Sequence, residues 1–415
     1  MSRFTRHGAG SGRGLPHGKT SRWALRTLNL ARSALKLSPA RFHYLQGQAL
    51  RAKGESPRAL NSFRRALTFD PKSIDSTLAV AELLASQGNH SDSLSMLQRA
   101  RSLDPDALTI LRHLVVEAMA AEQHRTALQA ALELEQKSSD NLDDKHLVAA
   151  VMLQEREYQA ATLILEAYVA QRPQDSKAFL GLGLAYLNQQ QYSDAHKALE
   201  RSLQLDPGLA ETEYQLGVVA TKQGNTQEAI QKLEHAVEIQ ADHAKALLKL
   251  GTLYLQSGDL GRAQRMLEHS VVSDPTDPDT EYHLSLLFSR LDKPADARQH
   301  MERFSSLKAE AEYQIGIASR RDGKAEEAMR RFQHAVQLDP QHSKALLSLG
   351  MLYLEAGDLE KAQSMLQSAE AADPSNPETQ HQLSLLFTRL GMPGESLKHV
   401  ERLRKLKGAQ THGRN

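Results

Sequence analysis

Apolar residues recur with the period of a helix along most of the chain, and the whole pattern repeats about every 34 residues. The clearest copy spans residues 343–376, in which Leu346, Gly350 and Tyr353 fall on one helical face. Gly357 is expected to end this helix, because glycine enters the left-handed conformation at the C′ position without a steric penalty. The first half of the copy therefore predicts a helix that ends at Gly357.

The second half of the same copy predicts a second helix. Asp358 follows the glycine as an N-cap, and Asp373-Pro374 ends the helix, since proline has no N–H to donate. Small residues stand at Gly350 in the first helix and at Ala362 in the second. We expect the two helices to cross at these residues, where a larger side chain would push the backbones apart.

The prolines that follow the second helix set the register of the whole array. Pro71 and Pro105 are 34 residues apart, as are Pro173 and Pro207. Repeats are therefore predicted at 40–73, 74–107, 108–141, 142–175, 176–209, 210–243, 244–277, 278–308, 309–342, 343–376 and 377–408.

A longer period lies on top of this one. Residues 210–308 and 309–407 align over 99 positions without a gap, and LSLLFSRL at 284–291 faces LSLLFTRL at 383–390. A block of three repeats has evidently been duplicated, so any binding site in the block is expected twice.

The repeated positions resemble the tetratricopeptide-repeat (TPR) family. The residues of one copy that carry the resemblance are Phe179, Leu182, Gly183, Tyr186, Ala195, Leu199 and Pro207. The resemblance covers most of the chain. It implies an all-α, right-handed superhelical solenoid of antiparallel helix pairs with a concave groove that receives a protein or peptide segment.

Both ends of the chain depart from the repeat. Residues 1–20 are predicted to be a disordered basic segment, and residues 21–39 a capping helix that matches the second half of a repeat. An organellar transit peptide is the rival interpretation of this arginine-rich start. The array is divided into five TPR units at 40–209, a first triplet at 210–308 and a second triplet at 309–408, followed by a disordered tail at 409–415.

Composition excludes several classes of protein. The 415 residues include no cysteine, so disulfides and thiolate metal sites are ruled out, and the net charge is only +1. Residues 1–54 hold eleven Lys or Arg and no acid, which leaves 1 − 11 = −10 for the rest of the chain. No apolar run is long enough to span a membrane, and no secretory segment is visible. The sequence favours the cytoplasm, or an organelle or export if the N-terminus is a transit peptide or begins upstream.

No motif supports catalysis, a cofactor or a metal. HGKT at 17–20 lacks the first glycine of a phosphate-binding loop, since Arg13 stands there. Asp274, Asp277 and Asp279 lack the glycine and the glutamate of a calcium loop and are interpreted as a turn between repeats. The duplicated pairs His235/His243 and His334/His342 are predicted at exposed helix ends, where they do not converge as zinc ligands.

In TPR folds the first helix of each pair lines the groove, so its side chains are the candidate site. The candidates combine apolar residues with a fringe of Lys and Arg, which would suit a partner segment that carries apolar anchors and some acidic residues. The known chaperone-tail clamp and asparagine ladder of TPR proteins are not supported by the residues at these offsets. The candidate groove residues are Lys177, Leu180, Leu184, Tyr214, Val218, Lys245, Leu248, Tyr282, Leu286, Arg290, Tyr313, Ile317, Arg321, Lys344, Leu347, Met351 and Arg389.

The leading hypothesis is a non-enzymatic scaffold that binds a protein or peptide in this groove, with no small-molecule substrate. A second hypothesis is a regulatory or assembly subunit that recruits a separately encoded enzyme or a secretion or envelope complex. A third, weaker one is attachment to a membrane surface or nucleic acid through the basic residues 1–54, which high salt would weaken.

Overall fold

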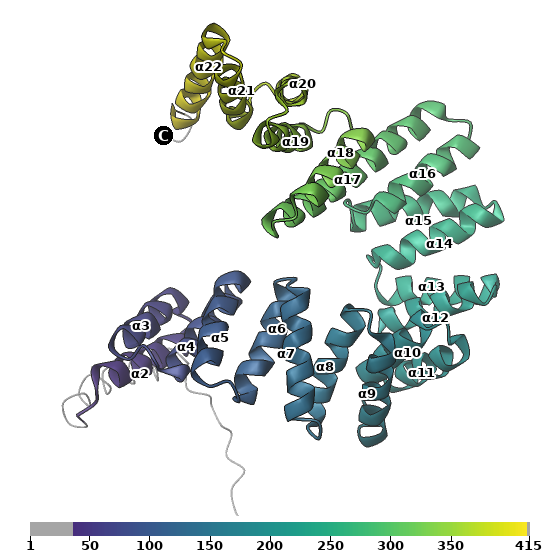
Figure 1. Cartoon of the computed structure of the whole chain (residues 1–415). Coiled ribbons are helices and arrows are strands. Elements are labelled where there is room, and N and C mark those ends of the chain that lie inside the picture. Colours follow the sequence, from purple (N-terminus) through teal and green to yellow (C-terminus); the bar gives the residue numbers. More distant parts are fainter. Residues whose placement is uncertain (1–35, 413–415) are drawn as a thin grey trace, which may run out of the picture. The chain divides into compact units, whose positions relative to one another are not determined.

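The computed structural model describes residues 36–412, and within this range all regular structure is α-helical. The predicted all-α solenoid fold of antiparallel helix pairs is confirmed (Figure 1). The chain divides into two compact units, the first ending at Pro207 and the second beginning at Gly208.

The helices of the first unit form five consecutive pairs. They are α2 (Pro39–Arg51), α3 (Ser56–Phe69), α4 (Ile74–Ser86), α5 (His90–Leu103), α6 (Leu108–Ala120), α7 (His124–Lys137), α8 (Leu142–Gln154), α9 (Tyr158–Gln171), α10 (Ser176–Asn188) and α11 (Tyr192–Leu205).

The second unit has the same organisation with one exception, at α17. Its helices are α12 (Ala210–Lys222), α13 (Thr226–Ile239), α14 (Ala244–Ser257), α15 (Leu260–Ser273), α16 (Pro278–Arg290), α17 (Pro294–Arg321), α18 (Ala325–Leu338), α19 (Ser343–Ala356), α20 (Leu359–Ala372), α21 (Pro377–Arg389) and α22 (Pro393–His412).

The helix ends follow the local chemistry of the sequence. Gly357 has φ +80° and closes α19, and the Asp358 side chain accepts a hydrogen bond of 3.1 Å from the Lys361 N–H at the start of α20. The less regular repeat at 108–141 turns at Glu122 with φ +54°, although a side chain makes this conformation costly. A glycine is therefore the preferred but not the obligatory residue at this turn.

Within each pair the two helices touch where the repeat has its small residues. A Cβ atom added at Gly350 would lie 2.7 Å from Leu366 Cγ, so the first helix can approach the second only because this side chain is missing. Ala362 and Leu366 on α20 are fully buried. The same contact joins Gly251 to Leu267 in the first triplet.

Helix α17 corrects the prediction of separate helices on either side of residue 309. It is a single helix of 28 residues that unites the second helix of repeat 278–308 with the first helix of repeat 309–342 (Figure 1). The three residues missing from repeat 278–308 fall where most other repeats have an Asp-Pro turn, as at Asp206-Pro207. Without proline or glycine nothing interrupts the helical hydrogen bonds.

The ends of the array also differ from the prediction. Helix α22 continues to His412, so part of the tail predicted as disordered at 409–415 is helical. Pro39 is the first residue of α2, with Ser38 as N-cap. Residues 1–20 of the predicted basic segment and residues 21–35 of the predicted capping helix lie outside the described residues.

Candidate functional site

The continuous helix α17 separates the first helices of the second unit into two sets. Helix α16 packs antiparallel to the beginning of α17, whose second half continues beyond the N-terminal end of α16 instead of turning back beside it. Ile315, in this second half, is 43% exposed, whereas its counterpart Leu216 on α12 is 1% exposed. We call the side chains of α12, α14 and α16 the first-triplet surface, and those of 309–321, α19 and α21 the second-triplet surface.

The structure places the predicted groove residues at different depths. Exposed side chains belong to Lys177, Lys245, Tyr282, Leu286, Arg290, Ile317, Arg321, Lys344 and Arg389. Half-buried ones belong to Leu180, Leu184, Tyr214, Val218, Leu248, Tyr313 and Met351. Leu347 is buried and packs in the core around Leu346 and Leu366. Lys177, Leu180 and Leu184 lie in the first unit, apart from the two surfaces just defined.

The two arginines that recur in both triplets have a structural contact. Arg290 donates a hydrogen bond of 2.6 Å to the carbonyl oxygen of Leu255, and Arg389 donates one of 2.7 Å to that of Leu354. These carbonyls belong to the last turns of α14 and α19, where each also accepts the N–H of the glycine that ends the helix, at 3.3 Å. Each guanidinium group thus joins two neighbouring first helices.

A second duplicated contact corrects the prediction that both histidines of each pair are exposed. His235 and His334 are exposed, but His243 and His342 are buried. His342 Nδ1 accepts the Ala345 N–H at 3.1 Å as the N-cap of α19.

The opposite ring nitrogen of each buried histidine faces a carboxylate. His342 Nε2 lies 3.1 Å from Glu310, and His243 Nε2 lies 3.3 Å from Glu211. The rings also pack against half-buried Tyr313 and Tyr214. These tyrosines therefore contribute mainly to the packing of successive repeats.

Sequence analysis missed two residues of the first-triplet surface, Lys249 on α14 and His283 on α16. Both are half-buried, and His283 Nδ1 is inaccessible to solvent and has no hydrogen-bond partner. Burial lowers the pKa of Lys249, and the charge of Lys222 on α12 lowers it further. Burial also lowers the pKa of His283, with Lys249 acting in the same direction. The signal in the sequence was the difference from Ser348 and Gln382, the counterparts in the second triplet.

In the first unit, several charged side chains form ion pairs between neighbouring first helices. Glu82 on α4 forms ion pairs with Arg51 on α2 and with His113 on α6, the latter at 3.5 Å. Arg112 donates to both carboxylate oxygens of Asp144 on α8, at 2.5 and 2.8 Å. Arg51, His113 and Arg112 are thus each paired with a carboxylate of a neighbouring first helix.

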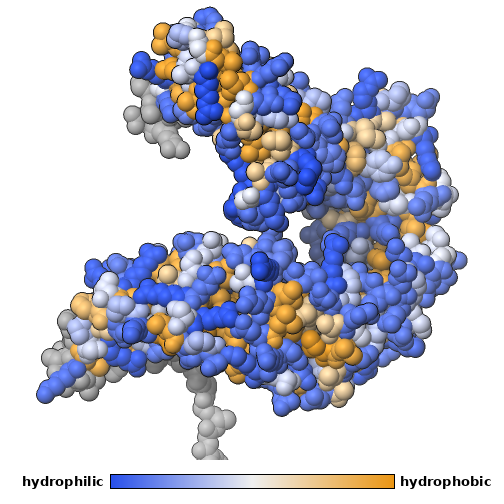
Figure 2. Space-filling view, viewed as in Figure 1, coloured by the Kyte–Doolittle hydropathy of each residue, from blue (hydrophilic) through white to orange (hydrophobic). Residues whose placement is uncertain are grey.

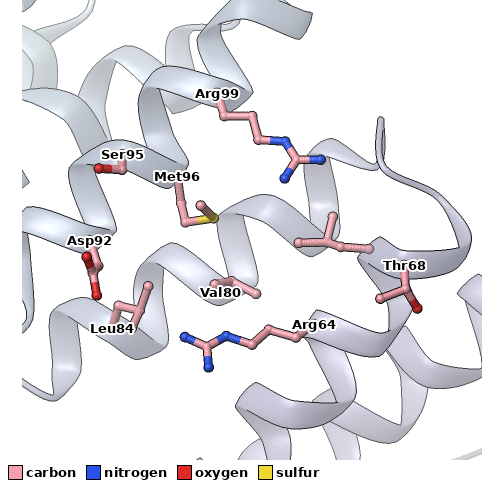
Figure 3. A pocket seen from close by; sticks show the side chains of 9 residues that line it. Arg64, Thr68, Val80, Leu84, Asp92, Ser95, Met96 and Arg99 are labelled. Carbon is pink, nitrogen blue, oxygen red and sulfur yellow. The ribbon is translucent and has the colours of Figure 1, made fainter.

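A hollow in the first unit is a further candidate for binding. It lies between α3, α4 and α5, with Val80, Leu84 and Met96 as apolar lining (Figure 3). Figure 3 shows Arg64 and Arg99 on opposite sides of this lining. Arg99 donates a hydrogen bond of 2.7 Å to the carbonyl oxygen of Pro71, so it supports the turn between repeats. The hollow is open, and no buried polar group points to a particular ligand.

Hydrophobic side chains reach the surface in scattered patches on both units, separated by hydrophilic ones (Figure 2). None of the helices within 36–412 is both long and apolar enough to cross a membrane. In the same residues no three His, Asp or Glu side chains are grouped as metal ligands. Asp277 instead caps α16, accepting the Thr280 N–H at 3.1 Å.

Three family models match the chain. The model of the cilia and flagella-associated protein 70 C-terminal domain matches residues 102–312, and two tetratricopeptide-repeat models match residues 26–74 and 320–384. The first match spans just over half of the chain. No curated protein matches the chain.

Solved structures with a related arrangement are TPR-like and distant in sequence. The APC/C hetero-tetramer Cut9-Hcn1 is 16% identical, with 84% of this chain and 76% of that chain covered and a TM-score of 0.39. A TPR protein from Parabacteroides merdae is 14% identical over 56% of this chain and 93% of that chain, with a TM-score of 0.49. MamA from Desulfovibrio magneticus RS-1 is 19% identical over 41% and 96%, with a TM-score of 0.39.

These structural likenesses are too weak to support an inference about partners. The match to the cilia and flagella-associated protein 70 C-terminal domain and the two TPR matches agree with the helix pairs and the small residues at their crossings. The chain belongs to the tetratricopeptide-repeat family, with residues 102–312 in the family of that C-terminal domain.

Proposed function

We propose that the chain is a non-enzymatic scaffold that binds a protein segment on the two triplet surfaces of its second unit. TPR arrays in general present extended binding surfaces built from successive repeats. The proposal names the surface and the chemistry of the partner: apolar anchors with some acidic residues.

The observation that carries the proposal is a leucine exposed at the same place in both triplets. Leu286 on α16 is 37% exposed and Leu385 on α21 is 41% exposed, although Leu287 and Leu386 beside them are fully buried. The fold thus presents this leucine outward twice. An apolar side chain that is exposed at the equivalent position of both copies supports a binding role for this position, especially where further exposed apolar side chains lie beside it.

Neighbouring side chains extend each surface. Tyr282 precedes Leu286 by one helical turn and is 38% exposed, and Ile317 on the second half of α17 is 37% exposed. Exposed Lys245 and Lys344 flank them on α14 and α19. An apolar surface with a cationic fringe fits an extended segment that carries leucine-like anchors and carboxylates.

The test is cross-linking of the tagged full chain in its own cell, followed by mass spectrometry of what it captures. Leu286→Glu and Leu385→Glu place a charge where an apolar anchor would dock. Each variant is expected to reduce capture of the same partner segment, and the double variant to abolish it. Val272→Glu is the control, because Val272 on the second helix α15 is 77% exposed and lies outside both surfaces.

Two outcomes would contradict the proposal. Unchanged capture by the double variant would exclude the triplet surfaces as the binding site. A separately encoded enzyme that co-purifies in equal amount with every variant would favour the alternative of a regulatory or assembly subunit.

A further inference from the structure

The two triplets align without a gap, and two of the positions at which they differ change the charge of the first helices. Where the first has Lys249 and His283, the second has Ser348 and Gln382. The two positions are equivalent on successive first helices, and α14 packs against α16. The first-triplet surface therefore has a lysine and a histidine that its duplicate lacks.

Lys222 and Lys249 have no carboxylate partner among residues 36–412. Neither Lys249 nor Lys222 forms an ion pair or a side-chain hydrogen bond there, and Lys249 is half-buried. This differs from Arg51, His113 and Arg112 on the first helices of the first unit, which are all paired. A partly buried ammonium group without a counter-ion costs free energy, which a bound anion would offset.

The two carboxylates that influence His283 are both engaged in other contacts. Asp277 is engaged as the N-cap of α16, and Asp279 lies 3.5 Å from Lys308 on α17. Both oppose the lowering of the His283 pKa, which burial and Lys249 nevertheless determine. The ring is held by its packing, including an edge contact with Tyr282 at 5.5 Å between centroids, since Nδ1 has no partner.

We propose that Lys222, Lys249 and His283 form a carboxylate-binding subsite of the first-triplet surface, which takes an Asp or Glu side chain of the bound protein segment. The subsite rests on the proposed function and adds to it an asymmetry. The first triplet recognises an acidic side chain of the segment through this subsite, which the second triplet lacks.

The surroundings favour a protein side chain over a free anion. Tyr282 and Leu286 are exposed on the same helix as His283. A ligand that fills the site must therefore place a carboxylate beside apolar groups. An acidic residue between two leucine-like residues has this chemistry, whereas inorganic phosphate would leave the apolar side chains uncovered.

The subsite makes binding dependent on pH. The lowered pKa keeps His283 neutral at about pH 7 in the free protein, and a carboxylate beside it favours the protonated ring. Binding should therefore take up a proton and become tighter between about pH 8 and about pH 6. The NMR titration of His283 should move to higher pH when the ligand is present.

The test uses the full chain and two acetylated, amidated peptides, one alternating leucine with glutamate and the other leucine with glutamine. Amidation removes the terminal carboxylate, so only side chains can occupy the subsite. The glutamate peptide is expected to bind about tenfold more tightly in fluorescence anisotropy, as a charge-assisted contact would give. Lys249→Ser with His283→Gln should remove this difference.

The double substitution copies the residues of the second triplet, so the fold has already accommodated them at the equivalent positions. Arg265→Ser is the matched control, because it removes an exposed cation of the same repeat that lies on the second helix α15, outside both triplet surfaces. This control should retain the preference for glutamate.

Retention of the preference by the double variant, or no preference in the native chain, would overturn the subsite. The proposed function would still stand if Leu286→Glu combined with Leu385→Glu abolished binding of both peptides, and it would fall with the subsite if this double variant changed neither. Inorganic phosphate that shifts the His283 signal as fully as the glutamate peptide would identify a free-anion site and would also overturn the proposal.

Discussion

At the scale of single residues, the contact between Gly350 and Leu366 shows how the repeat fixes the distance between its helices. A Cβ atom at Gly350 would lie 2.7 Å from Leu366 Cγ and 3.3 Å from the Leu366 backbone nitrogen. The leucine side chain could move, but the backbone nitrogen belongs to the partner helix. The small residue is thus required by packing and not by its own φ angle.

We predict that Gly350→Ala destabilises the protein by about 1–3 kcal/mol, because the added methyl group forces α19 and α20 apart. Gly261→Ala is the control, since the nearest side-chain atom there is 4.0 Å away and α15 gains helix propensity of about 0.5 kcal/mol. Urea unfolding followed by circular dichroism measures both. Equal midpoints for the two variants would show that the contact at Gly350 is not tight.

A pair of residues in the first unit makes stability depend on pH. A hydrogen bond with Glu82 raises the pKa of His113, and this contact lowers the pKa of Glu82. The histidine contribution is complete below its unfolded pKa of about 6.5 and is lost as pH rises through the higher folded pKa. The Glu82 contribution is present above about pH 4.5 and is lost as pH falls through the lowered folded pKa.

We therefore predict that the pair stabilises the protein most between about pH 4.5 and 6.5. His113 and Glu82 are 39% and 37% exposed, so the effect is at most about 1 kcal/mol after screening. Glu82→Gln should flatten the decline in unfolding free energy between about pH 6.5 and 8. A decline as steep as that of the native protein would assign it to other groups.

At the scale of elements, α17 is the helix whose structure differs from the one that the repeat pattern predicts. The sequence indicates helices on both sides of residue 309, and both exist. Whether the chain turns between them depends on three residues, and the absence of the Asp-Pro turn here leaves the helix unbroken. Ile315 and Gly316 still follow the repeat pattern, in which the equivalent Leu216 is buried. In the structure Ile315 does not pack against the preceding repeat.

This difference predicts unequal costs for equivalent substitutions in the two triplets. Leu216→Ala should cost about 2–5 kcal/mol, because Leu216 is 1% exposed and its removal leaves a cavity. Ile315→Ala should cost less than about 1 kcal/mol, because 43% of that side chain is already in water. Unfolding in urea compares them directly. Equal costs would mean that α17 is broken in solution as in the other repeats.

At the scale of the whole molecule, the duplication yields two binding surfaces of unequal chemistry. Each surface contains three first helices and one exposed leucine, but only the first has Lys249 and His283. The triplet, and not the single repeat, is therefore the unit that was copied with its surface.

We predict that one chain binds two molecules of the captured segment. Isothermal titration calorimetry should give two sites, with the first-triplet site weakening more strongly as salt rises because charges contribute to it. Leu385→Glu should leave one site with this salt dependence. A single site in the native chain would show that one segment spans both surfaces or that one surface is inactive.

The sequence by itself determined the helix pairs, their ends and their crossings, because these depend on interactions within about 34 residues. Glycine at Gly357, the cap at Asp358 and the small residue at Gly350 act through backbone conformation and local packing. The family resemblance followed from the same local positions.

Only the tertiary structure decided which side chains of the first helices remain accessible. Leu347 is buried and Leu286 is exposed, although both were candidates for the groove, because each exposure depends on where a neighbouring repeat packs. The surroundings of Lys249 depend on the tertiary structure in the same way, since neighbouring helices determine whether a carboxylate lies close enough to pair with its half-buried ammonium group. The sequence gives the identity and helical position of each residue, and the packing of the adjacent repeat determines whether its side chain is exposed.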